Sequence, residues 1–302
     1  MTPDPRFRLQ PKYFWANVRS VSQELGYTDR KTRNIRVPTF SEIAGALGSL
    51  ELDTRHIISS TGNITEFGQL LHDYFLYRAK VLNEFVCLQL MDAAQAKSLY
   101  ESVRAKYNPR YVPTMNKQKG EKKAASYLTA MTNLLIAANT KRFTCDFDPR
   151  SLTSITKDKI PLRTLARRVD GAFPSVINPV AVWEIKEYYY TTTFGSRVAD
   201  GVYETLLDGM ELEELQEHEG IKVQHILIVD AKYTWWDCGR SYLCRIIDML
   251  HMGYIDEVLF GREIVNRLPI IAKEWVKVVN DRKSGRGNKE EPSPGESPPT
   301  KK

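Results

Sequence analysis

Several features that would place this 302-residue chain in a membrane or outside the cell are absent from it. The longest apolar runs, such as HILIV at 225–229, are far shorter than the roughly 18–20 residues that a bilayer-spanning helix needs. The amino terminus MTPDPRFRLQPKYFW lacks the apolar core of roughly 7–15 residues found in secretory signals. We therefore expect a cytoplasmic, intracellular protein that has no contact with a membrane.

Cysteine is scarce, and the common nucleotide, zinc and hydrolase motifs are missing. Cys87, Cys145, Cys238 and Cys244 are far apart and form no CxxC pair, which excludes a disulfide framework at this chain length. The five histidines form no HExxH motif, and no GxxxxGK[ST], GxGxxG or GxSxG sequence is present. The usual ATP-binding, dinucleotide, zinc and serine-hydrolase interpretations are therefore disfavoured.

The charge of the chain is uneven. The formal net charge is +6, but residues 101–170 hold 15 Lys and Arg against 6 Asp and Glu, whereas residues 201–250 hold 4 against 10. Such an asymmetry indicates a basic face suited to a polyanion. Chance variation among solvated helices explains the charge alone equally well, so nucleic acid is only one interpretation at this point.

The chain changes character near residue 160. Before it, apolar residues at helical spacing predict helices over 41–47, 65–85 and 126–139, with a loop over 106–123. After it, VDGAFP, PVAVWEIKEYYYTTTF and IKVQHILIVDAKYTWW have the composition of strands. The same patterns predict a helix of crossover length over 196–220, a helix from 240 and a short element at WVKVVN. We predict a mainly helical region 1–160, an α/β core 161–280 and a disordered tail 281–302.

One segment, residues 167–190, carries a chemically informative pattern. Asp170 opens a strand, and after thirteen intervening residues Glu184 and then Lys186 stand at the end of an apolar run. Side chains alternate along a strand, so Glu184 and Lys186 project from the same face. If the two strands pair, the Asp170 carboxylate meets Glu184 across the ladder.

Two carboxylates and an ammonium suit metal-assisted hydrolysis of a phosphodiester. Carboxylate oxygens are hard ligands that suit Mg²⁺. A bound metal activates water and stabilises phosphoryl charge, while Lys186 orients the water or neutralises the transition state. Taken separately, a strand Lys beside Glu is usually an exposed ion pair, and Asp-Gly is usually a turn.

The pattern Asp170-x13-Glu184-Ile185-Lys186 resembles the motif of the PD-(D/E)XK nuclease superfamily. The amino-acid sequence of residues 167–174 and 183–212 resembles type II restriction endonucleases in particular. Val169 stands where the nominal motif has proline. The resemblance covers roughly residues 160–260. It implies a restriction-endonuclease-like mixed β-sheet core flanked by helices, with Asp170, Glu184 and the Ile185 carbonyl as Mg²⁺ ligands and Lys186 as the catalytic lysine.

The same resemblance implies the activity and the partners. The expected protein is a Mg²⁺-dependent endonuclease that cuts double-stranded DNA as a homodimer in a bacterial or archaeal cell, beside a separately encoded DNA methyltransferase. Its helical region 1–160 would serve DNA recognition or dimerisation. A non-catalytic DNA-binding or regulatory module on the same fold, and a scaffold protein with a basic helical face, are the alternatives. Candidate phosphate-contacting residues are Lys117, Lys119, Lys122, Lys123, Arg167, Arg168 and Arg197. We expect the acidic crossover helix to face away from DNA.

Three assignments remain open from the sequence. A further helix acid of the site is Glu66 or Glu84, although both residue positions also suit solvated helix acids. Glu204, on the crossover helix, either faces the site or packs elsewhere. Asp230 and Lys232 form a second acid-x-lysine pattern, which we disfavour because no acid partner lies just before it.

Overall fold

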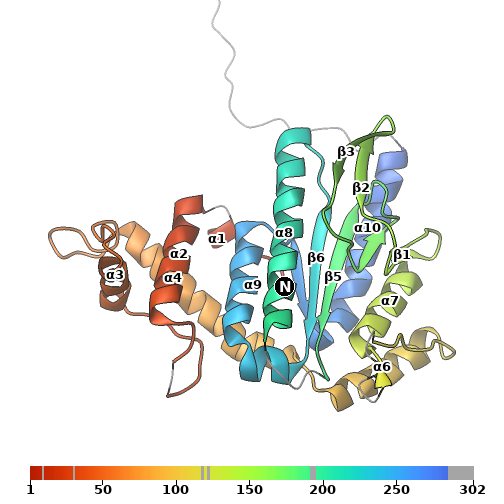
Figure 1. The fold of residues 1–302 in the computed structure, drawn as a ribbon, viewed down its shortest axis with the longest axis horizontal. Helices are drawn as coiled ribbons and strands as arrows, with labels where there is room; N and C mark the ends of the chain where they lie inside the picture. Colours follow the sequence, from red (N-terminus) through yellow and green to blue (C-terminus); the bar gives the residue numbers. More distant parts are fainter. Residues whose placement is uncertain (9, 30, 117–118, 121–122, 191–194, 285–302) are drawn as a thin grey trace, which may run out of the picture.

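A five-stranded mixed sheet forms the centre of this computed structural model, which describes residues 1–8, 10–29, 31–116, 119–120, 123–190 and 195–284 (Figure 1). The strand order is β1-β4-β5-β6-β7. The first three strands are antiparallel, and β5, β6 and β7 are parallel. The strands are β1 (Asp146–Phe147), β4 (Gly171–Phe173), β5 (Ala181–Glu187), β6 (Gln224–Asp230) and β7 (Glu257–Phe260); β2 (Ser154–Lys157) and β3 (Ile160–Thr164) form a separate hairpin.

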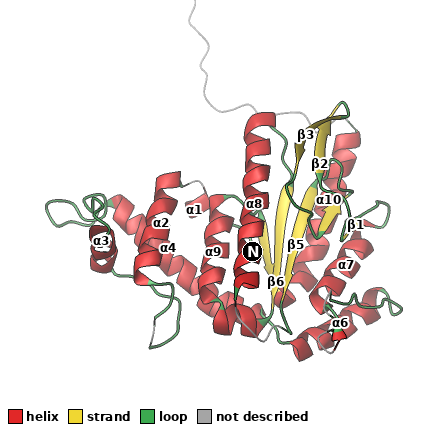
Figure 2. Cartoon of the chain, viewed as in Figure 1, coloured by secondary structure: helices red, strands yellow, loops and turns green. Residues whose placement is uncertain are grey.

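Helices cover both faces of the sheet, so the core has three layers (Figures 1 and 2). On β6, Ile226 and Ile228 pack with α7 (Tyr127–Thr140) and α10 (Ile264–Lys283). Leu227 and Val229, on the opposite face, pack with α8 (Ser196–Glu219) and α9 (Arg240–Met252). The continuous apolar run of β6 follows from this burial on both faces.

The amino-terminal helices form a second apolar cluster beside the sheet. Within it, Phe14, Leu47 and Tyr74 are buried side chains of three successive helices. The helices of this cluster are α1 (Pro5–Arg8), α2 (Lys12–Leu25), α3 (Phe40–Ser49) and α4 (Glu66–Lys80). The π-helical η1 (Val81–Val86) and α5 (Cys87–Gln89) follow, and α6 (Ala93–Tyr107) packs with α7 on the sheet.

The predicted helices over 41–47, 65–85, 126–139 and 196–220 are confirmed, and the mixed α/β class is confirmed as well. The strand predicted to run on through YTWW is wrong, because β6 ends at Asp230 and Tyr233–Cys238 forms the π-helical η3. WVKVVN is the second half of the long helix α10, which also includes residues 281–283. Residues 285–302 of the expected tail lie outside the described residues.

A buried ion pair joins the amino-terminal helices to the core. Arg78 of α4 is 1% exposed, and its Nη1 donates to both carboxylate oxygens of Asp248 on α9, at 3.0 Å each. The Tyr74 hydroxyl donates to the same carboxylate at 2.6 Å. Because each charge has its counterion and its hydrogen bonds, the pair tolerates burial.

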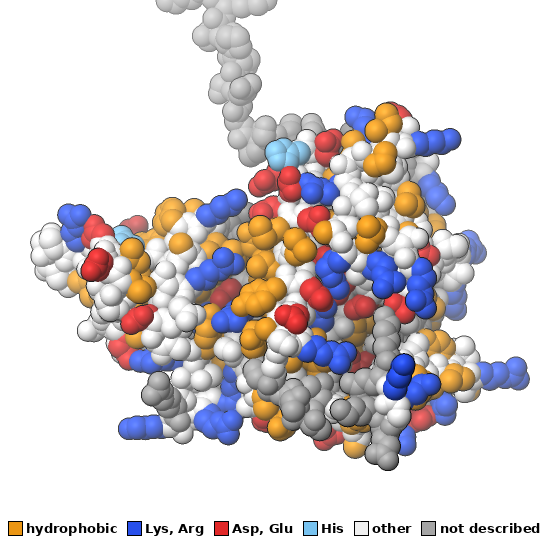
Figure 3. Space-filling model, viewed as in Figure 1, with side chains coloured by type: hydrophobic (Ala, Val, Ile, Leu, Met, Phe, Trp, Pro, Cys, Tyr) orange, Lys and Arg blue, Asp and Glu red, His pale blue; other side chains and the backbone are white. Residues whose placement is uncertain are grey.

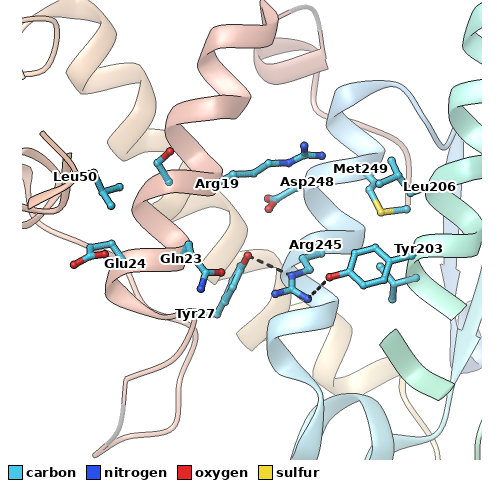
Figure 4. Close-up of a pocket in the computed structure, with 12 residues that line it drawn as sticks. Arg19, Gln23, Glu24, Tyr27, Leu50, Tyr203, Leu206, Arg245, Asp248 and Met249 are labelled. Carbon is cyan, nitrogen blue, oxygen red and sulfur yellow. Dashed lines mark hydrogen bonds between the residues drawn. The ribbon is translucent and has the colours of Figure 1, made fainter. Parts of the chain in front are cut away.

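Next to this ion pair, a pocket of about 500 Å³ lies between α2 and the helices α8 and α9 (Figure 4). Arg245 of α9 bridges it, donating to the hydroxyl of Tyr27 at 3.4 Å and to that of Tyr203 at 3.1 Å. Hydrophobic side chains gather on the adjoining surface of α8, where Leu207 and Met210 are exposed (Figure 3). Within the described residues, no helix combines the length and the apolar character that a membrane span requires.

Replacing Arg78 by methionine should destabilise the protein strongly. The substitution keeps an apolar stem in place but leaves the Asp248 carboxylate buried without a counterion. Breaking a buried pair in this way costs about 3–5 kcal/mol. Urea unfolding of Arg78→Met against wild type measures the loss.

The exposed pair of Arg55 and Asp53, 2.6 Å apart, provides the matched control. Arg55→Met should leave the unfolding midpoint unchanged, because exposed ion pairs contribute little. Equal losses in the two variants would contradict the structural role given to the Arg78 pair.

Candidate functional site

The pairing of β4 with β5 brings Asp170 beside Glu184. Gly171 is the partner of Trp183 in the ladder, so Asp170, one residue before β4, lies opposite Glu184. The Asp170 amide donates to Glu184 Oε1 at 3.2 Å, and the Ile185 amide donates to Asp170 Oδ2 at 2.8 Å. The two carboxylates are therefore held in position by backbone groups of the neighbouring strand.

Glu184 and Lys186 point to the same face of β5, toward α8. The Lys186 ammonium donates to Glu184 Oε2 at 2.9 Å and to Glu204 Oε2 of α8 at 3.1 Å. Gly201 of α8 permits this close approach, since a Cβ there would lie 3.3 Å from the Cδ of Lys186 and 2.7 Å from the Tyr188 hydroxyl.

Arg167, in the segment before β4, links Glu184 to two acids of α8. Its Nη1 lies 3.0 Å from Glu184 Oε1 and 2.5 Å from Asp208 Oδ2. Its Nη2 donates to Glu184 Oε2 at 3.2 Å and to Glu204 Oε2 at 3.3 Å. The cluster of Asp170, Glu184, Glu204 and Asp208 with Arg167 and Lys186, called the acidic cluster below, holds four carboxylates and two protein cations.

This charge balance sets the protonation of the acidic cluster. Burial, reinforced by the nearby Glu184 charge, raises the pKa of Asp170 to about 6 and that of Asp208 to about 7. Burial also acts to raise the pKa of Glu184, but Lys186 and Arg167 outweigh it and hold that pKa below its usual value. Burial acts to lower the pKa of Lys186, yet Glu184 and Asp170 raise it overall, so the side chain stays an ammonium.

An open cavity of about 460 Å³ gives access to the acidic cluster. Across the described ranges, no three acidic, histidine or cysteine side chains converge in the arrangement of a metal site. The cavity is lined by polar residues of several elements, among them Asn116, Asp148, Arg167, Asp170, Lys186, Arg197, Asp200 and Glu204.

The predicted phosphate-contacting residues divide into three groups. Lys119, Lys123, Arg168 and Arg197 are exposed, and Arg197 lines the cavity, with its guanidinium 5.8 Å from the ring centre of Tyr188. Arg167 instead bonds to carboxylates inside the acidic cluster. The remaining two, Lys117 and Lys122, lie outside the described residues.

Neither candidate for the further helix acid reaches the site. Glu66 is an exposed residue in the first turn of α4, Glu84 is exposed on η1, and neither lines the cavity. The helix acids found in the acidic cluster are Glu204 and Asp208. Gly201, Glu204 and Asp208 follow the spacing i, i+3 and i+7, so they lie on one face of α8. The sequence contains this spacing, but it identifies these residues only if that face of the helix is known to meet β5.

Asp230 and Lys232, the second acid-x-lysine pattern, lie in different surroundings. Asp230 is buried and accepts hydrogen bonds from the Met91 and Ala231 amides, at 2.7 and 2.8 Å, and from the Tyr189 hydroxyl at 2.5 Å. Lys232 is exposed. The acid and the lysine of this second pattern therefore do not meet.

Comparison with known families places the chain without assigning it an activity. A family model described as Domain of unknown function (DUF7687) matches residues 91–275, more than half of the chain, and the chain belongs to that family. A second model, Domain of unknown function (DUF7690), matches residues 1–85. No curated protein and no solved structure matches the chain. Residues 86–90 separate the two matched regions, just after the amino-terminal helices.

Replacing Asp230 by asparagine should change the pH dependence of stability. Burial raises the pKa of Asp230 to about 7, so the folded state binds its proton more tightly than the unfolded state does. The contribution of Asp230 to stability therefore falls as pH rises from about 4 to about 7 and is constant above that. The free energy of unfolding of wild type minus that of Asp230→Asn should decline over this range in urea titrations.

The carboxamide of the Asp230→Asn variant can still accept from the Met91 amide and donate to the Tyr189 hydroxyl, so the variant should fold. An increase in that difference between pH 5 and 7 would show that Asp230 is charged and stabilised when folded, contrary to this prediction.

Proposed function

We propose that this chain is a Mg²⁺-dependent endonuclease of the PD-(D/E)XK superfamily that hydrolyses phosphodiester bonds of double-stranded DNA, as a type II restriction endonuclease does. The observation that carries the proposal is the meeting of Asp170, Glu184 and Lys186 at one sheet position, where Asp170 and Lys186 line an open cavity. The strand order supports it, because the antiparallel pair β4-β5 is followed by α8 and the parallel strand β6, which is the order strand, strand, helix, strand that the resemblance implies.

The donors near the cavity fit a hard divalent cation. Asp170, Glu184 and the Ile185 carbonyl would hold Mg²⁺, which prefers oxygen ligands. Asp208 Oδ1 is buried without a hydrogen-bond partner, and the pKa values of Asp170 and Asp208 are raised. Burial, with the nearby Glu184 charge, disfavours the ionised form of both acids, and a bound cation would favour that form. Bound there, Mg²⁺ would activate water and stabilise charge on a phosphoryl oxygen.

The residues of the chain have separate roles in this proposal. Lys186, held as an ammonium by Glu184 and Asp170, donates hydrogen bonds to a water or a phosphate oxygen and does not act as a base. Asp170 is fixed by the Ile185 amide. Arg197 and Arg168, both exposed, contact DNA phosphates, with Lys119 and Lys123 adding charge.

The proposed substrate, double-stranded DNA, determines the oligomeric state that we expect. Cutting both strands of a duplex requires two active sites, so we propose a homodimer. A restriction enzyme also implies a separately encoded DNA methyltransferase that protects the host DNA, in a bacterial or archaeal cell.

A non-catalytic DNA-binding or regulatory module is the second candidate. It is favoured by the engagement of both Glu184 oxygens with Arg167 and Lys186, which leaves the carboxylate neutralised by the protein itself. The module predicts DNA binding without cleavage at any Mg²⁺ concentration.

Substitutions at the site should abolish Mg²⁺-dependent cleavage. Asp170→Asn keeps an acceptor for the Ile185 amide but removes the charge, and Lys186→Met keeps the stem beside Gly201 but removes the donor. Each should lower the cleavage rate by about 10²-fold or more. The measurement is the initial rate of cutting on a varied duplex library with Mg²⁺.

Asp230→Asn and Lys232→Met are the matched controls, since they alter the second acid-x-lysine pattern, and both should cut at the wild-type rate. Loss of activity in these two, with Asp170→Asn and Lys186→Met active, would move the catalytic strand to β6. Binding by wild type without cleavage on every duplex would favour the module.

Arg197 should contribute one phosphate contact. Arg197→Ala should weaken DNA binding and lower the slope of log K against log salt by about 1, because each phosphate contact releases counterions. Fluorescence anisotropy over a salt series measures it, with Arg55→Ala, an exposed arginine of the amino-terminal region, as the control. Equal slopes for wild type and Arg197→Ala would remove Arg197 from the interface.

A further inference from the structure

The Glu184 carboxylate has no acceptor position left for a metal. An ionised carboxylate offers about four lone-pair positions. Oε1 faces the Asp170 amide at 3.2 Å and Arg167 Nη1 at 3.0 Å, and Oε2 faces Lys186 Nζ at 2.9 Å and Arg167 Nη2 at 3.2 Å. A divalent cation that binds Glu184 must therefore displace a protein donor.

Arg167 is the donor best placed to leave. The Asp170 amide is part of the backbone, and Lys186 projects from the same strand as Glu184 with its side chain only 8% exposed. The Arg167 side chain is 23% exposed, comes from the segment before β4 and lines the open cavity.

The three acids that Arg167 contacts also surround a position that suits a cation. Its guanidinium contacts Glu184, Glu204 and Asp208 together. Asp208 is fully buried, and its Oδ1 has no hydrogen-bond partner although it belongs to this group. The guanidinium thus satisfies these acids incompletely, and a more compact, doubly charged ion is a chemical alternative to it.

We propose that Arg167 is a built-in cation that competes with the divalent metal for Glu184. This inference rests on the proposed function and deepens it, because it makes metal loading of the site depend on release of Arg167. While Arg167 holds Glu184, the site fills only at a divalent-ion concentration high enough to displace the guanidinium. Arg167 is a positioning residue in this account, acting through Glu184.

The test is equilibrium binding of Mn²⁺, followed by the electron paramagnetic resonance signal of the free ion. Arg167→Met, which keeps the apolar stem, should bind Mn²⁺ about tenfold more tightly than wild type, or more, because a competing charge within a few ångströms is removed. Arg167→Lys, which keeps the charge but not the fork of donors, should fall between the two. Asp170→Asn identifies the site, since it should weaken Mn²⁺ binding in both backgrounds.

Arg163→Met is the matched control. Arg163 also pairs with acids of α8, with Nη2 2.5 Å from Glu214 Oε2 and Nη1 3.8 Å from Glu211 Oε1, but it does not contact Glu184. Its replacement should leave Mn²⁺ affinity unchanged. If Arg167→Met proves unfolded, the double variant Arg167→Met/Asp208→Asn preserves the net charge, and it should bind Mn²⁺ more tightly than Asp208→Asn alone.

The outcomes separate this inference from the proposed function. Wild type that binds Mn²⁺ and cuts DNA, with Arg167→Met binding equally or more weakly, overturns the competition and leaves the nuclease intact. Absence of Mn²⁺ binding in wild type and in folded Arg167 variants overturns both. Equal tightening in Arg163→Met also overturns the inference, since the effect would then reflect overall charge.

Discussion

Compensation of buried charge between strand β5 and helix α8 is the constraint on which this part of the structure depends. Glu184, Asp208 and Lys186 are buried, and an ion taken out of water costs several kcal/mol unless a counterion and hydrogen bonds replace the lost solvent. Here Lys186 bonds to Glu184 on its own strand and to Glu204 of α8, and Arg167, from the segment before β4, bonds to Asp208 of α8 and to Glu184. A shift of α8 along the sheet would separate Glu204 and Asp208 from Lys186 and Arg167 together, so the register of the helix is tied to these charges.

The backbone is shaped to allow this contact. Gly171 lies against the Trp183 ring across the β4–β5 pair, and Gly201 lies against Tyr188 and Lys186. A side chain at either glycine would push the strands or the helix apart. Close packing and charge pairing therefore involve the same strands and helix. The close packing brings the charged side chains near enough to pair.

The local part of the site was predictable from the sequence, whereas its long-range part was not. Alternation along one strand places Glu184 and Lys186 on the same face, and the antiparallel pairing of β4 with β5 accounts for Asp170. The roles of Arg167 and Asp208 depend on which face of α8 meets the sheet, which strand periodicity does not specify. Composition also misled at YTWW, where Trp235 is buried within a helical turn because tertiary packing overrides strand propensity.

The fold pairs part of the basic stretch of the sequence with its acidic stretch. The acidic stretch was expected to lie on a helix facing away from DNA; in the fold Glu204 of α8 lines the cavity, Asp208 is buried beside it, and Arg167 contacts both. Arg163, also from the basic stretch, pairs with Glu211 and Glu214 of the same helix. Part of the basic excess is therefore neutralised within the molecule, and a polyanion meets a smaller positive surface than the count over 101–170 implies. Specific contacts at the cavity, more than general basicity, must then supply the affinity that the proposed function requires.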